Sequence, residues 1–306
     1  MILSLDPLIS QQEALFDMPK SRSSALLPSV AALFIAVAIA LPAPACTVWG
    51  AAGAEFVKGG GVLAAKIRDE KPLPQSYRRV EDGDGYAFEG LFAGPRGRFN
   101  TGVNAKGLFV GRAAASSVSW DTRLKFREFR SPEGYRGPEY LARRCATVEE
   151  ALARTEVFTG RPVTLILADS KETAVVEVLP DGTHTVERRE NGFVTHTNHY
   201  KQPASVPFNE KTGKSSETRL ARINALLEGS EKPWTLEDFA AWTRDRNDGP
   251  DRSLFRTGSK KGGTRTLAAV TVRLAPDGRV HMRTAYQPDP ENDSEWVVKE
   301  SEFLRE

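Results

Sequence analysis

An apolar segment that ends at a short junction of small residues divides this 306-residue chain into two unequal parts. Residues 25–41 are mostly apolar, two basic residues precede them, and Ala43-Pro44-Ala45 follows. A positive n-region, a short apolar run and a small-residue cleavage site are typical of an export signal. We therefore expect residues 1–45 to be removed, and the exported protein, periplasmic or extracellular, to begin at Cys46.

Other interpretations of this region stay open. The apolar run could remain as an uncleaved membrane anchor, although it is shorter than the roughly 20 apolar residues that a spanning helix needs. The stretch before Met18 is acidic for an n-region, so the chain could start at Met18. No later segment is apolar enough to cross a membrane, so we expect no stable membrane span after signal removal.

The part of the chain after the junction has the composition of an ordinary soluble domain. Residues 46–306 are long enough for one domain with a full core, and we expect a single one. The whole chain has a formal net charge of +2, and no block of like charge indicates a nucleic-acid partner. Its four histidines are scattered and it has no CxxC pair, so we expect no metal site and no cofactor.

The chain has two cysteines, Cys46 and Cys145. An exported protein could join them in a disulfide. Cys145, however, lies in residues 140–152, whose pattern predicts an amphipathic helix, so a buried structural thiol is the favoured interpretation. A mature chain beginning at Cys46 would carry a thiol and an α-amine on one carbon, and that amine, with a pKa near roughly 8, could act as the base for the thiol.

The hydrophobic pattern predicts hairpins of strands interrupted by pairs of helices. The strands are expected at residues 46–49, 62–67, 77–80, 86–92, 108–110, 163–168, 174–179, 183–187, 193–197, 267–274 and 279–285. Helices are expected within 137–156, over 215–227 and after Thr235, with Asp238 completing a capping box. The tail after Gln287 is polar and contains helix-forming residues. This order favours an α+β fold of two antiparallel sheets covered by helices.

Five short segments, in this order, resemble a known family. They are Cys46-Thr47, residues 61–69 with Lys66 and Asp69, the Gly-x-Asn-x-x-Gly-Leu turn at 102–108, Thr197-Asn198-His199, and the helix start at 215–219 that contains Arg219. Together they resemble the N-terminal nucleophile (Ntn) hydrolases of the linear amide class, which include the choloylglycine hydrolase type. The chain is most similar to the isopenicillin N acyltransferase type, over nearly all of residues 46–286.

The resemblance implies a four-layer αββα sandwich with Cys46 at the end of an inner strand. Cys46 would attack the carbonyl of a linear amide, and its own α-amine would carry the proton to the leaving amine. Asp69, which a hairpin of the first two strands brings back toward Cys46, would hold that amine. The expected substrate is a small-molecule N-acyl compound, and the reaction is hydrolysis or acyl transfer.

The resemblance also assigns the surroundings of the thiol. The side chain of Asn198 and a backbone N–H at Ala114 would donate to the oxyanion. Arg219 would lie near the thiol and favour its thiolate. Lys66 belongs to the same set of site residues and stands where many relatives have arginine, so it keeps the charge but loses the planar fork. Ile67 stands where many relatives have asparagine, so an inactive relative that keeps only the fold is one alternative.

Each of these residues also has a plainer interpretation. Asp69 could be a turn residue, Asn198 a loop cap, and Arg219 part of a solvated helix face, while His199 is expected to be structural. Cys46 could instead carry a lipid that anchors a binding protein to a membrane surface, which would consume both its thiol and its amine. Ala43-Pro44-Ala45 fits ordinary signal cleavage better than a lipid-attachment site.

Overall fold

Two antiparallel β-sheets form the centre of the protein in the computed structural model, which describes residues 45–81 and 83–306. The first sheet contains, in spatial order, β10 (Gly192–His196), β1 (Ala45–Ala52), β2 (Val62–Glu70), β11 (Arg265–Leu274), β12 (Arg279–Tyr286) and β13 (Val297–Leu304). The second contains β3 (Gln75–Val80), β4 (Phe88–Ala93), β5 (Arg98–Asn104), β6 (Phe109–Ala114), β7 (Val163–Ala168), β8 (Thr173–Val178) and β9 (His184–Arg189). The predicted signal lies outside the described residues, apart from Ala45.

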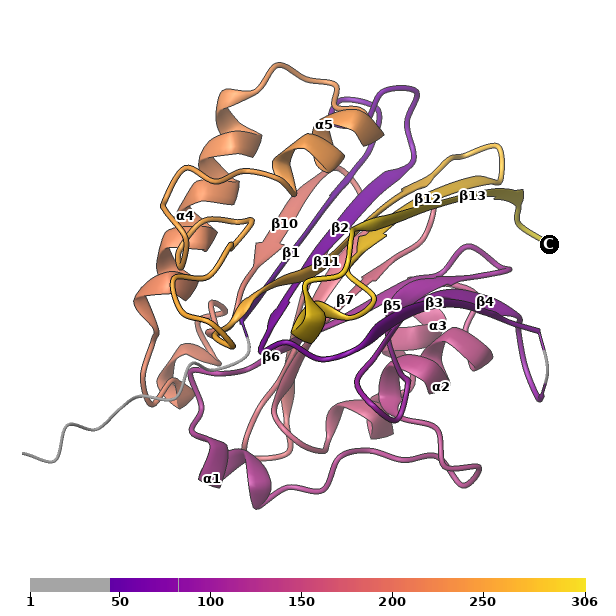
Figure 1. The fold of residues 1–306 in the computed structure, drawn as a ribbon. Coiled ribbons are helices and arrows are strands. Elements are labelled where there is room, and N and C mark those ends of the chain that lie inside the picture. Colours follow the sequence, from indigo (N-terminus) through magenta and orange to yellow (C-terminus); the bar gives the residue numbers. More distant parts are fainter. Residues whose placement is uncertain (1–44, 82) are drawn as a thin grey trace, which may run out of the picture. The chain divides into compact units, whose positions relative to one another are not determined.

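Helices cover the outer face of each sheet (Figure 1). The helices α4 (Lys214–Gly229) and α5 (Leu236–Trp242) pack on the first sheet, and α2 (Gly137–Arg144) and α3 (Val148–Leu152) pack on the second. A short helix, α1 (Trp120–Leu124), follows β6. The layers are therefore helix, sheet, sheet and helix, which confirms the predicted αββα sandwich.

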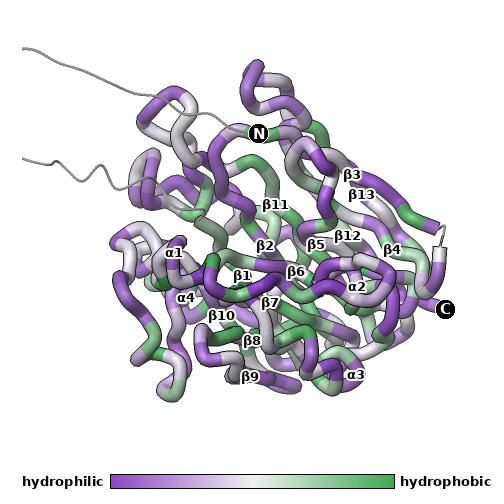
Figure 2. Tube along the Cα trace, turned by 90° about the horizontal axis from the view of Figure 1, so that it is seen from below, coloured by the Kyte–Doolittle hydropathy of each residue, from purple (hydrophilic) through white to green (hydrophobic). Residues whose placement is uncertain are grey.

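Alternation along β1 decides which side chains enter the space between the sheets. Cys46 and Val48 point into the core between the sheets, whereas Trp49 and Ala51 pack against the helical layer of α4 and α5. Figure 2 shows the hydrophobic residues gathered in the central strands, with hydrophilic residues in the outer loops. Because side chains alternate with a period of two, the thiol of Cys46 lies on the inner face of its sheet.

The first hairpin has the register that brings the predicted site together. Three consecutive glycines at 59–61 adopt φ values of 75°, 71° and 78°, a region that other residues rarely enter, and they turn the chain between β1 and β2. Cys46 then lies opposite Arg68, and Ala45 lies opposite Asp69. The expected return of Asp69 toward the start of β1 is confirmed.

Two parts of the fold differ from the sequence-based expectation. The segment Arg98–Asn104, for which no element was expected, is the strand β5. The polar tail forms the edge strand β13 rather than a helix, because Val297 and Phe303 pack on the core while the residues between them are mostly exposed. An edge strand with one solvent-exposed face carries few apolar residues, so the hydrophobic pattern that predicts a strand is weak there.

Cys145 is a buried free thiol between α2 and α3, as expected, and so is not joined to Cys46. Burial raises the pKa of the Cys145 thiol to about 11.

The capping box of Thr235 and Asp238, expected from the sequence, is present at the start of α5.

Candidate active site

A cavity opens where strands β5 and β6 part. The two strands pair only between Thr101–Val103 and Phe109–Gly111, so the start of β5 and the end of β6 diverge. Asn100 and Arg112, the first residues beyond the paired region, line a cavity of about 530 Å³, and Cys46 lines it from the facing sheet. The nucleophile predicted from the sequence therefore lies at a pocket of the size that small ligands occupy.

A connected set of hydrogen bonds joins Cys46 to two other predicted residues. The backbone nitrogen of Cys46 donates to Asn198 Oδ1 at 2.8 Å, and Asn198 Nδ2 donates to the carbonyl of Ala114 at 2.8 Å. Arg219 donates to the Cys46 carbonyl at 2.6 Å, to Thr47 Oγ1 at 2.7 Å and to Asn198 Oδ1 at 2.8 Å. Arg219 is fully buried, so it does not belong to a solvated helix face.

Asp69 lies on the other face of β2, toward the helical layer. Its Oδ1 accepts from Thr266 Oγ1 at 2.7 Å, while its buried Oδ2 has no hydrogen-bond partner among the described residues. Burial raises the pKa of this carboxyl group, against the opposing charges of Arg219 and Arg256. In the described chain the Cys46 nitrogen is still a peptide nitrogen and donates to Asn198, not to Asp69.

Lys66 lies on the inner face of β2, and its ammonium group donates to Asn100 Oδ1. Burial lowers the pKa of Lys66 to about 7; the charge of Cys46 opposes this shift, and Arg68 and Arg112 add to it. Lys66 packs against Gly111 of β6, where a Cβ would lie 3.4 Å from Lys66 Cδ but only 2.9 Å from Thr101 Oγ1. Lys66 is thus a buried amine close enough to Cys46 to feel its charge, and its lowered pKa leaves it only partly protonated at neutral pH.

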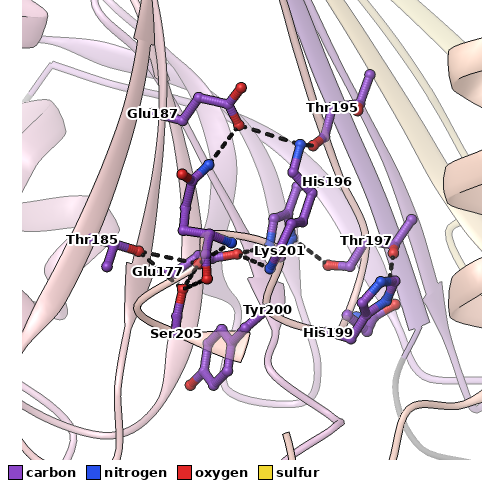
Figure 3. Close-up of polar contacts among 12 residues, drawn as sticks. Glu177, Thr185, Glu187, Thr195, His196, Thr197, His199, Tyr200, Lys201 and Ser205 are labelled. Carbon is purple, nitrogen blue, oxygen red and sulfur yellow. Dashed lines mark hydrogen bonds and ion pairs between the residues drawn. The ribbon is translucent and has the colours of Figure 1, made fainter. Parts of the chain in front are cut away.

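A second polar cluster lies behind Asn198, between β8 and β10 (Figure 3). Glu177 accepts hydrogen bonds from His196 Nε2 at 2.7 Å, from the backbone of Lys201 at 2.7 Å and from Ser205 Oγ. Burial alone would raise the pKa of Glu177, but the hydrogen bonds and charge of His196 outweigh it and hold the pKa at about 2. The other ring nitrogen of His196 lies 2.8 Å from the carbonyl of Thr197, so both ring nitrogens of His196 face acceptor oxygens.

The segment that carries Asn198 is fixed from both sides. The Asn198 backbone N–H donates to Ser216 Oγ at 2.9 Å, and its carbonyl accepts from the N–H of Ser117 at 3.0 Å. His199 Nδ1 lies 2.8 Å from the same Ser216 oxygen, and burial lowers the pKa of His199 to about 4. His199 is therefore a neutral member of this scaffold, in line with the structural interpretation.

The sequence interpretation missed Glu177, His196 and Ser216 as neighbours of the site. Glu177 carried one usable signal, because it is a lone acidic residue within the otherwise apolar strand β8. An acidic side chain that faces a protein interior needs partners, and the structure supplies them from β10 and the loop after it.

Comparison with known families decides the relationship of this chain. Residues 58–285 match the family described as acyl-coenzyme A:6-aminopenicillanic acid acyl-transferase, and they make up well over half of the sequence. The chain belongs to this family. Membership of this family makes it an enzyme of the acyl-transferring type.

A solved structure shares the fold of this acyl-transferase family member. A Caenorhabditis elegans ortholog of N-acylethanolamine-hydrolyzing acid amidase is similar, with a TM-score of 0.50 and 13% identity over 74% of this chain and 92% of that chain. A variant of conjugated bile acid hydrolase from Clostridium perfringens matches with a TM-score of 0.44 and 12% identity over 84% of this chain and 97% of that chain. A search of curated proteins gave no match.

Within residues 45–81 and 83–306, no group of three or more histidine, cysteine or acidic side chains is placed to hold a metal ion. Across the same residues, no helix combines the length and the apolar character needed to cross a membrane.

Proposed function

We propose that this protein is an exported amidohydrolase or acyltransferase whose nucleophile is Cys46, freed as the N-terminal residue by removal of residues 1–45. It cleaves the linear amide C–N bond of a small N-acyl compound. The observation that carries the proposal is the bonded set of Cys46, Asn198 and Arg219 at the wall of the cavity.

The first step forms a bond between Cys46 Sγ and the carbonyl carbon of the substrate. The thiol proton moves to the α-amine of Cys46, and the carbonyl oxygen becomes an oxyanion. The α-ammonium group then gives its proton to the substrate nitrogen as the C–N bond breaks, which leaves a thioester and a free amine. Water attacks the thioester in hydrolysis, and an acceptor amine attacks it in acyl transfer.

The contacts of Asn198 and Ala114 support the proposal that both donate to the oxyanion. One hydrogen of Asn198 Nδ2 is committed to the Ala114 carbonyl, and the second remains for a substrate oxygen. In an extended strand the N–H and the C=O of one residue point to the same side, so the N–H of Ala114 is directed toward the side where Asn198 lies. Losing one such donor typically slows the chemical step about 100- to 1000-fold.

Asp69 is suited to hold the new α-ammonium group. It lies opposite Ala45 in the register of β1 and β2, and its Oδ2 has no partner among the described residues. A buried carboxylate oxygen without a partner is costly. Cleavage after Ala45 would place a positive charge on the adjacent nitrogen and so supply that partner. Lys66 and Arg219 add the positive charge that stabilises a thiolate.

Two alternatives fit the site less well. A lipid-anchored binding protein would need Cys46 at the surface, yet Cys46 is only 4% exposed and packs in the core between the sheets. An inactive scaffold would have no need to keep Asn198 and Arg219 bonded to Cys46. The substitution of Lys66 and Ile67 for the residues common in relatives leaves those contacts intact.

The test is expression of the full chain in a bacterial host, with intact mass and N-terminal sequence measured on the exported protein. We expect a start at Cys46 with an unmodified amine, and release of free amine from a panel of N-acyl compounds. Cys46→Ala should abolish this release, while Cys145→Ala, a matched change at the other cysteine, should retain it. An uncut chain, a lipid-sized mass increase, or a fully active Cys46→Ala protein would overturn the proposal.

A further inference from the structure

The cavity beside Cys46 is lined by far more positive than negative side chains. Seven arginines and two glutamates line it, although the whole chain has a net charge of only +2. The arginines come from separate segments of the chain: Arg68, Arg96, Arg98, Arg112, Arg123, Arg136 and Arg161. Positive charge is therefore gathered at this site rather than spread evenly over the protein.

Arg123 is the one buried arginine of this lining, and few partners are recorded for it among the described residues. The residue is only 7% exposed, and its buried Nε has no hydrogen-bond partner. Its one recorded side-chain contact among the described residues is with the ring of Trp120, 5.1 Å from the guanidinium carbon to the ring centroid. A charge withdrawn from water without a counter-charge is costly, so a guanidinium held in this way fits a site completed by a ligand.

Arg161 brings a second cation to the same ring. Its guanidinium carbon lies 5.9 Å from the Trp120 centroid, and its Nε donates to the carbonyl of Phe126 at 3.4 Å. Burial lowers the pKa of Arg123, and the charge of Arg161 lowers it further. Two like charges on one indole repel each other, and an anion between them would relieve that repulsion.

The acidic side chains of the cavity do not balance these charges. Glu128 is shared, because Arg136 lies 2.7 Å and Arg112 lies 3.4 Å from its two carboxylate oxygens. Glu70 accepts from the neighbouring backbone N–H of Lys71 and forms no ion pair among the described residues. Among the described residues, no carboxylate is therefore bonded to Arg123 or Arg161, and the charge of Glu70 acts on Arg123 only from a distance.

Arg112 connects this charge to the reacting atoms. Arg112 and Ala114 are two residues apart on β6, so their side chains project from the same face of the strand, roughly 7 Å apart along it. The carbonyl of Ala114 is bonded to Asn198, whose Oδ1 accepts from the Cys46 nitrogen. A group bound at Arg112 is therefore within the length of a small molecule from Cys46.

We propose that this cavity binds an oxyanion, a carboxylate, sulfonate or phosphate group, through Arg112, Arg123 and Arg161, and that the substrate is an anionic N-acyl compound. The anion site stands on the geometry of the cavity, whereas its assignment to the substrate rests on the proposed function. Guanidinium groups suit this task because their planar forks give two parallel, charge-assisted hydrogen bonds to such oxygens.

The anion site can be tested without knowledge of the substrate. Iodoacetate and iodoacetamide alkylate a thiolate by the same displacement of iodide, and they differ in carrying a carboxylate or a neutral amide. The rate constants of both reagents at Cys46 would be measured by mass spectrometry of the Cys46 peptide, which separates it from Cys145. Their ratio, compared with the ratio for N-acetylcysteine, reports the preference of the cavity for an anion.

We expect the iodoacetate to iodoacetamide ratio at Cys46 to be at least about tenfold higher than for N-acetylcysteine, and to fall as salt is added. Arg123→Gln should lower it several-fold. Arg279→Gln, a matched change at an exposed arginine outside the cavity, should not. A ratio equal to that of the free thiol, an equal loss in both arginine variants, or a Cys46 that reacts with neither reagent would overturn the anion site.

The second arm assigns the anion to the substrate. Two chromogenic or amine-releasing pairs would be compared by kcat/KM: glutaryl against pentanoyl p-nitroanilide for the acyl side, and N-hexanoylglycine against N-hexanoylglycinamide for the amine side. We expect one anionic member to exceed its neutral partner about tenfold or more, which also tells which side carries the charge. Turnover without preference in either pair overturns the substrate assignment and leaves the proposed function standing. An anion-selective Cys46 in a protein with no amidase or acyl-transfer activity would sink the proposed function alone.

Discussion

Two buried polar regions flank Asn198, and they are built in opposite ways. On one side, the carboxylate of Glu177 accepts from His196, from Ser205 and from backbone N–H groups, so that its charge is balanced and its oxygens are occupied. On the other side, the cavity beside Cys46 is lined by Arg123, a residue that is only 7% exposed and whose guanidinium has no carboxylate bonded to it among the described residues.

This difference separates a structural network from a binding site. A saturated polar cluster lowers its own free energy and fixes the atoms around it, here the strand end that carries Asn198. A cluster with unbalanced charge raises the free energy of the protein without ligand, and a ligand of opposite charge removes that cost by balancing the charge. The same chemistry of buried charge therefore has two uses within one active-site region.

The largest expected effect comes from breaking the saturated cluster with Glu177→Gln. The substitution keeps the shape of the side chain but removes the buried carboxylate to which His196 Nε2, Ser205 Oγ and the backbone of Lys201 donate. Breaking one partner of a buried pair typically costs about 3–5 kcal/mol of unfolding free energy, and we expect a loss of that order. The measurement is urea unfolding of wild type and variant at pH 7.

A matched control for this change is Glu149→Gln. Glu149 is 78% exposed at its side chain and pairs with Arg188 at the surface, so its loss should cost about 1 kcal/mol or less. The two glutamates thus receive the same substitution in opposite environments. Equal losses in both variants would show that the Glu177 cluster is no more structural than a surface ion pair.

The lowered pKa of Glu177 also predicts how the unfolding free energy of the wild type changes in acid. Its pKa, held at about 2, lies below the ordinary value of 4.5, so the folded state binds its proton less readily than the unfolded state. The stability it contributes is present above pH 4.5 and is lost as the pH falls toward 2. The difference in unfolding free energy between wild type and Glu177→Gln should therefore shrink over this range; a difference that stays constant from pH 6 to pH 3 would contradict it.

Most of the fold followed from local pattern, and the exceptions have a common cause. The β1–β2 hairpin and the paired helices α2 and α3 are marked by glycine turns, caps and apolar spacing within a few residues. The strands β5 and β13 lack such local signals. Each has few apolar residues, and these are recognised as core positions only once the strand is paired with its neighbour. Strand pairing over long sequence separations supplies information that a local window does not hold.

The candidate site divides in the same way. Cys46, Asp69, Asn198 and Arg219 could be named from short segments, because each belongs to a recognisable local motif. The arginine cavity could not, since Arg112, Arg123 and Arg161 lie on three segments of no special pattern and meet only where β5 and β6 diverge. Arginines that come together only in the folded structure cannot be recognised by counting charges along the sequence.

Substitution of Lys66 is expected to have a smaller, pH-dependent effect on the unfolding free energy, and it tests a buried charge on the Cys46 side of Asn198. Its pKa of about 7, below the ordinary 10.5, means that the unfolded state binds more protons between these values, so stability rises with pH. Lys66→Met removes the titrating group and should flatten that rise by at most about 1.4 kcal/mol per pH unit. Unfolding free energies of both proteins at pH 7, 8 and 9 check this, and parallel profiles would contradict it.

The smallest expected effect is that of Arg123→Gln on stability, and it tests the comparison most directly. Arg219 is the matched residue, since it is also a buried arginine, but its guanidinium donates to Cys46, Thr47 and Asn198. We expect Arg219→Gln to cost about 3 kcal/mol or more, because it leaves buried acceptors without donors. Arg123→Gln should change the unfolding free energy by less than about 1 kcal/mol, and in the stabilising direction at low salt, because it removes a cation that Arg161 repels. Urea unfolding at two salt concentrations measures both. A loss in Arg123→Gln as large as that in Arg219→Gln would mean that Arg123, like Arg219, is a structural cation. The cavity would then not differ from the Glu177 cluster in having an unbalanced charge that a ligand completes.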